Sequence, residues 1–187
     1  MSHYRDYIDD VVKSGSTKAF YHIVKEFENQ VFTYCLRFVK NREVAEEAAQ
    51  DVFLRCYRNI HSLRDYDKFP QWLFKIAYSV AIDYVRKVSV RMTDLEENVI
   101  AMTTDQDIQE EWSPDLESAL RMLDPKDLSL IVLYYQEDMS VKEICEVTDL
   151  SPSNVKVRLF RARSELRNYL DLRGKYSKHA QNIKNKL

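Results

Sequence analysis

Glycine and proline are scarce in this sequence, which has two glycines and four prolines in 187 residues. So few turn-forming residues argue against a β-sandwich and against a disordered chain. Because 45% of the residues are hydrophobic, there is enough apolar material for a compact core. The length allows one large domain or two small ones. We therefore expect an all-α protein.

Long apolar runs are also absent. No stretch reaches the roughly 18 apolar residues that a membrane-spanning helix needs, and the polar N-terminus does not resemble a signal peptide. We expect a cytoplasmic protein with no membrane insertion of its own. The three cysteines, Cys35, Cys56 and Cys145, are odd in number, far apart and on apolar helical faces. This pattern predicts reduced packing residues rather than disulfides or a redox centre.

Motifs for catalysis are missing as well. The sequence has no glycine-rich phosphate loop and no nucleophile motif built on serine or cysteine. Glu46, Glu47 and Asp51 cluster on one predicted helix, but no histidine joins them at metal-ligand spacing. His22 and Glu26 stand one helical turn apart, a spacing typical of a surface contact. We expect no enzyme, no metal site and no cofactor.

Charges are sorted along the chain, although their formal sum is only −2. Residues 93–118 contain nine acidic residues and no basic one, whereas residues 152–187 contain ten basic residues and two acidic ones. The acidic segment predicts a flexible linker at 92–112, and the weakly patterned end predicts a frayed basic tail at 174–187. A basic end of this kind attracts phosphate.

Helical periodicity in the front half predicts three long amphipathic segments, preceded by a possible short helix at residues 4–14. The first runs from Thr17 until Asn41 breaks the pattern, the second begins near Val44, and the third has Pro70 in its first turn. Residues 1–91 are therefore expected to form one small helical bundle. The apolar side expected for the third segment comprises Phe69, Trp72, Leu73, Ile76, Ala77, Val80 and Tyr84.

Aromatic and basic residues alternate in the third segment. Aromatic faces stack on unpaired bases and cations follow the backbone, so the pattern suits single-stranded DNA. The alternative is that Phe69, Trp72 and Tyr84 simply pack the bundle, and taken alone this alternative is favoured. The aromatic residues are Phe69, Trp72, Phe74, Tyr78 and Tyr84, and the basic ones are Lys75, Arg86 and Lys87.

The rear half, residues 113–173, predicts a second bundle that ends in a helix-turn-helix. Ser140 and Glu143 have the spacing of a capping box, and Ser151 followed by Pro152 starts the next helix. Only a tight corner fits between them. Asp149 can serve in place of the usual turn glycine, because aspartate tolerates a left-handed backbone.

The second helix of this motif has an apolar and a basic side. Val155, Leu159, Ala162 and Leu166 form a buried stripe. In a helix-turn-helix, such a helix enters the DNA major groove. The alternative is a solvated basic helix in an ordinary bundle. The opposite side is expected to carry Lys156, Arg158, Arg161, Arg163 and Arg167.

Three segments in order resemble the extracytoplasmic-function (ECF) sigma factors, the two-domain initiation factors of bacterial RNA polymerase. They are VAEEAAQDVFLRCYRNI at 44–60, FPQWLFKIAYSVAIDYVRK at 69–87 and SNVKVRLFRAR at 153–163. The likeness covers roughly residues 15–170. It implies a protein that binds core RNA polymerase, recognises and opens promoter DNA, responds to a stress or envelope signal, and is inhibited by an anti-sigma factor.

The resemblance also implies roles for individual residues. Residues 1–91 would be sigma domain 2 and residues 113–173 sigma domain 4. Core polymerase would contact Gln50, Asp51, Phe53 and Arg55. The minus-ten element, including a flipped base and the melted strand, would contact Leu63, Arg64, Asp65, Lys68, Trp72, Lys75, Tyr78, Ser79, Arg86 and Lys87. The minus-thirty-five duplex would contact Pro152, Ser153, Asn154, Lys156, Val157, Arg158, Phe160, Arg161 and Arg163.

Some positions depart from the family's pattern. Ser79 stands where asparagine is usual, Ser153 and Asn154 replace a Gly-Thr pair, and Val157 replaces a frequent serine, so the preferred promoter bases stay open. Two other interpretations also stay open. One is a DNA-binding regulator that reads an operator through residues 113–170 without polymerase, and the other is an interaction protein that titrates polymerase or a partner.

Overall fold

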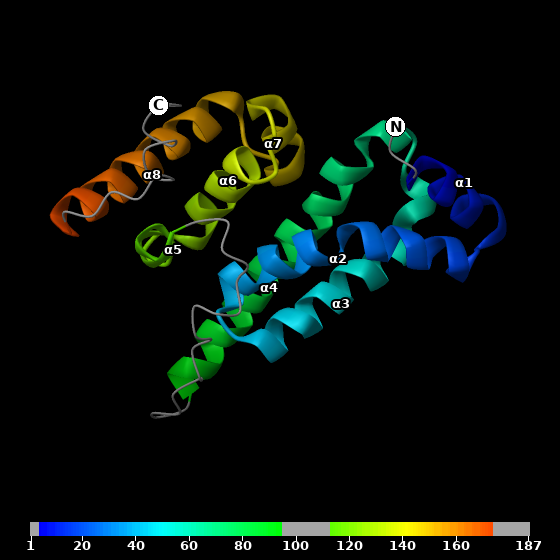
Figure 1. Cartoon of the computed structure of the whole chain (residues 1–187), viewed down its shortest axis with the longest axis horizontal. Helices are drawn as coiled ribbons and strands as arrows, with labels where there is room; N and C mark the ends of the chain where they lie inside the picture. The colour runs from blue at the N-terminus through cyan, green and yellow to red at the C-terminus, as the bar shows by residue number, and fades with distance from the viewer. Residues whose placement is uncertain (1–3, 95–112, 174–187) are drawn as a thin grey trace. The chain divides into compact units, whose positions relative to one another are not determined.

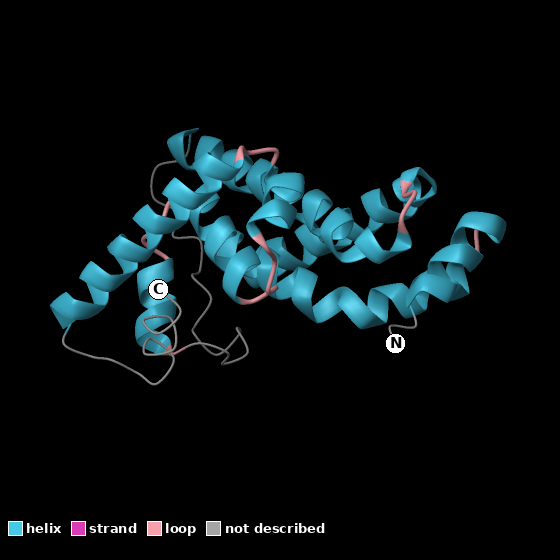
Figure 2. Ribbon diagram, turned by 90° about the horizontal axis from the view of Figure 1, so that it is seen from above, coloured by secondary structure: helices cyan, strands magenta, loops and turns pink. Residues whose placement is uncertain are grey.

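The computed structural model describes residues 4–94 and 113–173, with side chains described for 4–87 and 113–171. Every regular element in these ranges is a helix, as expected (Figures 1 and 2). The chain divides into two compact units, residues 1–102 and 103–187. The predicted linker at 95–112 and the predicted tail at 174–187 lie outside the described residues.

The first unit is built around α2, Thr17–Val39, which contacts α1, α3 and α4. These neighbours are α1, Tyr4–Ser14, α3, Arg42–Asn59, and α4, Phe69–Asp94, so the short N-terminal helix is present and α4 runs beyond residue 91. Two 3₁₀ turns, η1, Ile60–Ser62, and η2, Tyr66–Lys68, connect α3 to α4. α2 ends at Val39, where Lys40 adopts a left-handed backbone of φ 55° and its N–H donates to the Leu36 carbonyl. Asn41, where the pattern was expected to break, accepts a hydrogen bond from Val44 N and starts α3.

The buried side of α4 differs from the prediction at four positions. Trp72, Ile76 and Tyr84, expected on the apolar side, are only partly buried, whereas Phe74, which was not expected there, is 1% exposed. Phe69, Leu73, Ala77 and Val80 follow helical spacing and lie fully inside. Trp72 falls on the flank of this stripe, and Tyr84 directs its hydroxyl toward the surface of α3.

The second unit is built around its last helix, α8, Pro152–Arg173, which contacts α5, α6 and α7. These three are α5, Pro114–Leu120, α6, Pro125–Tyr135, and α7, Val141–Thr148. The predicted stripe on α8 is buried, with each of its four side chains at most 3% exposed. The three helices that contact α8 bury Leu116, Ile131 and Ile144, all 0% exposed.

Local capping explains the turn between α7 and α8. The Ser140–Glu143 capping box is complete, with both reciprocal hydrogen bonds present. Asp149 ends α7 with a left-handed backbone of φ 57°, and its N–H donates to the Cys145 carbonyl at 3.0 Å. Asn154 N donates to Ser151 Oγ at 3.3 Å at the start of α8. The helix-turn-helix predicted from these residues is confirmed, including the left-handed aspartate.

Candidate functional sites

The outer face of α8 lies opposite its buried stripe. Val157 is 48% and Phe160 70% exposed, and these are large apolar side chains that a soluble surface rarely presents side by side. Lys156 and Arg161 are exposed on the same helix. We call this surface the outer face of α8; it comprises the exposed residues Pro152, Ser153, Asn154, Lys156, Val157, Phe160 and Arg161.

Arg158 and Arg163, which were expected opposite the buried stripe of α8, instead reach α6, so their predicted placement on the helix is wrong. Arg158 donates from Nε to Asp127 Oδ1 at 2.6 Å, and its Nη2 lies 3.7 Å from Asp124 Oδ1. The Arg163 guanidinium lies over the rings of Tyr134 and Tyr135, at 5.3 and 5.6 Å from their centroids. Arg158 lies one helical turn from both Val155 and Ala162 of the buried stripe, and Arg163 lies one turn from both Leu159 and Leu166. Both side chains therefore lie at the edge of the stripe, where they reach α6.

The loop between η1 and α4 carries the residues expected to capture a base. Leu63 is partly buried, whereas Arg64, Asp65 and Lys68 are exposed. The Asp65 side chain accepts a hydrogen bond from Asp67 N at 3.0 Å, which caps η2. Because this hydrogen bond lies within the turn itself, the polar side chains of Arg64, Asp65 and Lys68 stay on the surface.

The N-terminal helix α1 supports the same loop. Arg5 forms an exposed ion pair with Asp67. The Tyr4 ring lies 5.7 Å from the rings of both Phe27 and Phe69, and Phe69 begins α4 directly after the loop. Periodicity in residues 4–14 was too weak to predict this support.

The aromatic platform expected on α4 is only partly available. Phe69 and Phe74 are 0% and 1% exposed, so they cannot stack on a base, while Trp72 and Tyr78 are partly exposed. Lys87 Nζ lies 5.0 Å from the centroid of the Tyr84 ring. The side chains of Lys75, Ser79, Arg86 and Lys87 are exposed, which leaves a polar and basic surface on α4.

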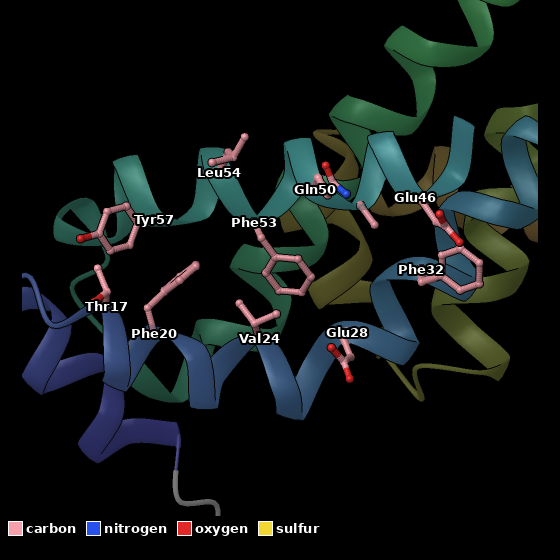
Figure 3. Close-up of a pocket in the computed structure, with 11 residues that line it drawn as sticks. Thr17, Phe20, Val24, Glu28, Phe32, Glu46, Gln50, Phe53, Leu54 and Tyr57 are labelled. Carbon is pink, nitrogen blue, oxygen red and sulfur yellow. The ribbon is translucent and has the colours of Figure 1, made fainter. Parts of the chain in front are cut away.

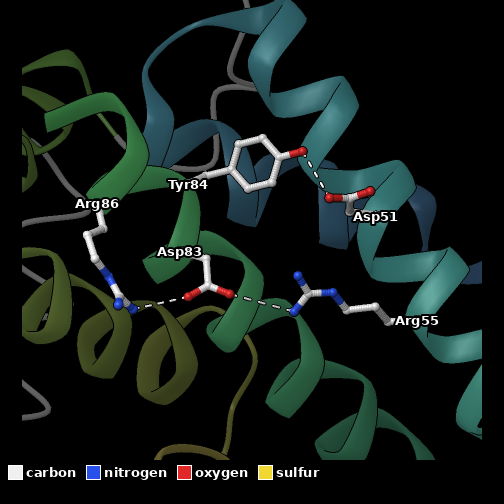
Figure 4. A network of polar contacts seen from close by, with 5 residues as sticks. All are labelled: Asp51, Arg55, Asp83, Tyr84 and Arg86. Carbon is white, nitrogen blue, oxygen red and sulfur yellow. Dashed lines mark hydrogen bonds and ion pairs between the residues drawn. The ribbon is translucent and has the colours of Figure 1, made fainter. Parts of the chain in front are cut away.

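Most residues expected to contact polymerase are engaged within the first unit (Figure 4). Asp51 accepts a hydrogen bond from Tyr84 Oη at 3.0 Å, and Arg55 lies 3.7 Å from Asp83, which also pairs with Arg86 at 3.1 Å. Burial, assisted by the bond to the Asp51 carboxylate, raises the pKa of Tyr84 to about 12. Of the four expected residues, Gln50 is exposed, Asp51 and Arg55 are partly buried, and Phe53 is only 9% exposed.

A groove between α2 and α3 runs past Gln50 and encloses about 600 Å³ (Figure 3). Phe20 and Val24 from α2 point toward Phe53 from α3, which forms an apolar floor. Leu54 lines the groove and is 51% exposed. The groove was not predicted, although Leu54 on an otherwise polar helix face was a usable signal. Its remaining lining residues are Thr17, Glu28, Phe32, Glu46, Ala49 and Tyr57.

Within the described ranges, no three potential metal-ligating side chains lie together. All three cysteines are free thiols, and burial raises the pKa of Cys35 and of Cys56 to about 12. Neither thiol therefore has the lowered pKa that a nucleophile requires. None of the described helices has the length and hydropathy of a membrane span.

Comparison with known families and structures covers both units. Residues 23–90 match sigma-70 region 2, and residues 114–166 match sigma-70 region 4. The solved structure of CnrH in complex with the cytosolic domain of CnrY has a TM-score of 0.67 at 23% identity, covering 91% of this chain and 99% of that one. The sigma factor RpoE in complex with the anti-sigma factor NepR, from Bartonella quintana, also has a TM-score of 0.67, at 19% identity, covering 83% and 98%.

Two relatives from Bacillus subtilis are more similar in sequence. The ECF RNA polymerase sigma factor SigM is 31% identical over 150 residues, which cover 78% of this chain and 91% of the relative. The ECF RNA polymerase sigma factor SigW is 31% identical over 173 residues, which cover 85% of this chain and 92% of the relative. With region 2 and region 4 matched in order and relatives aligned over nearly their whole length, the chain belongs to the ECF sigma factors.

Proposed function

We propose that this ECF sigma factor binds core RNA polymerase through its first unit and reads two promoter elements, one with each unit. The observation that carries the proposal is the outer face of α8, where apolar and basic side chains are exposed together on the second helix of a helix-turn-helix. The protein then acts as a transcription initiation factor in the cytoplasm and performs no bond chemistry itself.

Residues 113–173 are proposed to act as sigma domain 4 on the minus-thirty-five duplex. Arginine suits guanine edges or phosphates, and an apolar side chain suits the methyl group of thymine. Lys156, Phe160 and Arg161 supply these three kinds of contact from one exposed surface. Ser153, Asn154 and Val157 lie on the same surface and would help to select the bases.

Residues 1–91 are proposed to act as sigma domain 2 on the minus-ten element. Loop 63–68, with Leu63 at its start and Arg64, Asp65 and Lys68 exposed, would hold a flipped base, whose unstacking costs a few kcal/mol. The melted strand would pass along the exposed polar and basic side chains of α4. Trp72 and Tyr78 offer partly exposed rings for stacking, and the polar set is Lys75, Ser79, Arg86 and Lys87.

Core polymerase is proposed to bind at the groove between α2 and α3. Gln50 and Leu54 are exposed at its edge, and its apolar floor provides surface to bury. Asp51 and Arg55 stabilise the packing of α3 on α4, so they would support this surface more than touch the partner. Phe53 contributes through the floor of the groove.

An anti-sigma factor is proposed as the regulator, acting in response to a stress or envelope signal. The solved structure of RpoE contains the anti-sigma factor NepR, and that of CnrH contains the cytosolic domain of CnrY. This chain has the same fold over most of its length. A bound inhibitor would compete with polymerase or promoter DNA for the exposed surfaces described above.

Transcription with purified core polymerase tests the proposal. We expect initiation at a defined set of promoters on genomic DNA only when the full chain is added, and the mapped starts should share two upstream elements. Absence of promoter-dependent initiation on every template would contradict it. Tight operator binding by the chain alone, without polymerase, would favour a DNA-binding regulator instead.

A further inference from the structure

We infer that Arg158 and Arg163 are positioning residues, which set how α8 is held on α6, rather than contacts to DNA. The inference rests on the proposed function, because it concerns how α8 is presented to the minus-thirty-five duplex. Sequence pattern alone groups both arginines with the DNA-facing residues. Within the second unit, however, both arginines contact α6, which indicates that they position α8.

One attachment lies at the start of α6. The Arg158 side chain is 25% exposed and that of its partner Asp127 is 17% exposed, so the 2.6 Å hydrogen bond between them is partly shielded from water. Asp124, the residue that caps α6, lies 3.7 Å from the same guanidinium. A charge-assisted bond in such a place is stronger than an exposed surface pair.

The other attachment lies at the end of α6. Arg163 covers the rings of Tyr134 and Tyr135, and its Nε is buried. A guanidinium over an aromatic face combines cation–π attraction with packing of its flat surface, which lysine reproduces poorly. Removing this contact would expose the rings of both tyrosines.

Two contacts between α8 and α6 fix the angle between the helices, whereas a single contact would leave α8 free to pivot about it. Asp127 and Tyr134 are about 10 Å apart along α6 at a rise of 1.5 Å per residue, so the two arginines hold both ends of the helix. The apolar stripe resists separation of α6 and α8 but allows small rotation and sliding, because hydrophobic packing is not directional. The arginines therefore determine the angle at which Lys156, Phe160 and Arg161 meet the major groove.

Neutralising Asp127 distinguishes a phosphate contact by Arg158 from a positioning role, because the two predict opposite changes in affinity for promoter DNA. If Arg158 contacts a phosphate, Asp127→Asn removes a competing acid and a repulsive charge, so promoter binding becomes tighter. If Arg158 positions α8 through Asp127, the same substitution loosens the helix and promoter binding becomes weaker. Arg158→Gln weakens promoter binding in both cases. It distinguishes them only by how steeply the affinity of the variant falls as the salt concentration rises.

The experiment uses the full chain assembled with core polymerase and a fluorescent promoter duplex chosen from mapped transcription starts. Affinity is measured over a range of potassium chloride concentrations, at a temperature where circular dichroism shows each variant fully folded. We expect Asp127→Asn and Arg158→Gln each to weaken binding about tenfold, and the double variant to be no weaker than the worse single one. The slope of log affinity against log salt should stay at the parent value, and discrimination against a scrambled minus-thirty-five element should fall.

Lys156→Gln is the matched control, since it removes an exposed charge from the outer face. Its salt slope should decrease by about 0.9, the value for one lost phosphate contact on duplex DNA. Tighter or unchanged binding by Asp127→Asn, or a slope change in Arg158→Gln equal to that control, would overturn the inference for Arg158. If Lys156→Gln and Arg161→Gln both leave affinity unchanged, α8 does not contact DNA and the proposed function fails instead.

Arg163→Lys tests the second attachment and decides the inference alone if Asp127→Asn does not fold. It keeps the charge that a phosphate contact needs but loses the flat surface that lies over the tyrosines. We expect a loss of affinity and of minus-thirty-five discrimination close to that of Arg163→Gln. Retention of parent affinity by Arg163→Lys, with loss in Arg163→Gln, would show a phosphate contact and contradict the proposed role.

Discussion

The hydroxyl of Tyr84 donates a 3.0 Å hydrogen bond to the carboxylate of Asp51, and this contact joins the middle of α3 to α4 (Figure 4). Arg55 and Asp83 approach each other across the same pair of helices. The groove proposed for polymerase is lined by α2 and α3, and none of these polar residues lines it. The network instead holds α3, one wall of the groove, against α4.

Tyr84→Phe should lower the free energy of unfolding by about 0.5–1.5 kcal/mol, the usual net value of one hydrogen bond. The loss should depend on pH. Because the pKa of Tyr84 in the folded chain is raised to about 12, its contribution is complete below the unfolded pKa near 10 and disappears as the pH rises through 12. Urea unfolding of both proteins at neutral and alkaline pH measures the difference. A difference that grows above pH 10 would contradict this account.

Leu54→Arg should weaken binding to core polymerase at least about tenfold, or 1.4 kcal/mol, because it puts a charge at the edge of the apolar groove. Stability should change by less than about 0.5 kcal/mol, since the side chain is 51% exposed. Fluorescence anisotropy with labelled chain measures the affinity. Tyr21→Arg is the control, as Tyr21 is 55% exposed on α2 and does not line the groove. Equal losses in both variants would argue against the groove.

Features predicted correctly from the sequence depend on neighbours within a few residues. Ser140 and Glu143 are three positions apart, and Asp149 needs only its own backbone to end α7. The contacts of Arg158 with Asp127 and of Asp51 with Tyr84 were not predicted, because these partners lie 31 and 33 residues away in the sequence. The periodicity of α8 led us to place Arg158 opposite the buried stripe, because the pattern within one helix does not tell which residue of another helix its side chain meets. The groove was missed for the same reason, since its floor combines residues from two helices.

Asp149→Val should destabilise the second unit by about 1–2 kcal/mol, because a branched side chain at φ 57° meets the steric penalty of the left-handed region. Asp149→Asn should cost much less, as asparagine also accepts this conformation at helix ends. Thermal unfolding of the full chain followed by circular dichroism compares them. Equal losses would mean that the charge of Asp149, rather than its backbone, matters at this corner.

Thiol labelling of the native chain should show one fast and two slow cysteines. Cys145 is partly exposed, whereas burial of Cys35 and Cys56 raises the pKa of each thiol to about 12 and blocks the reagent. Reaction with an aromatic disulfide at pH 8, followed by absorbance and peptide mapping, identifies the order. In urea all three should react at similar rates. Fast native labelling of Cys35 or Cys56 would reveal an opening of the first unit.

Arg161→Glu should abolish promoter-dependent transcription while leaving polymerase binding intact. Arg161 is exposed on the outer face of α8, where loss of one base contact costs about 1–3 kcal/mol and reversal adds repulsion from phosphate. The matched control is Arg167→Glu, which reverses an exposed arginine further along the same helix and should retain most activity. Run-off transcription and co-purification with core polymerase measure the two functions separately. If Arg161→Glu keeps full promoter activity, the chain does not read DNA with this face, and a protein that titrates polymerase becomes the better interpretation.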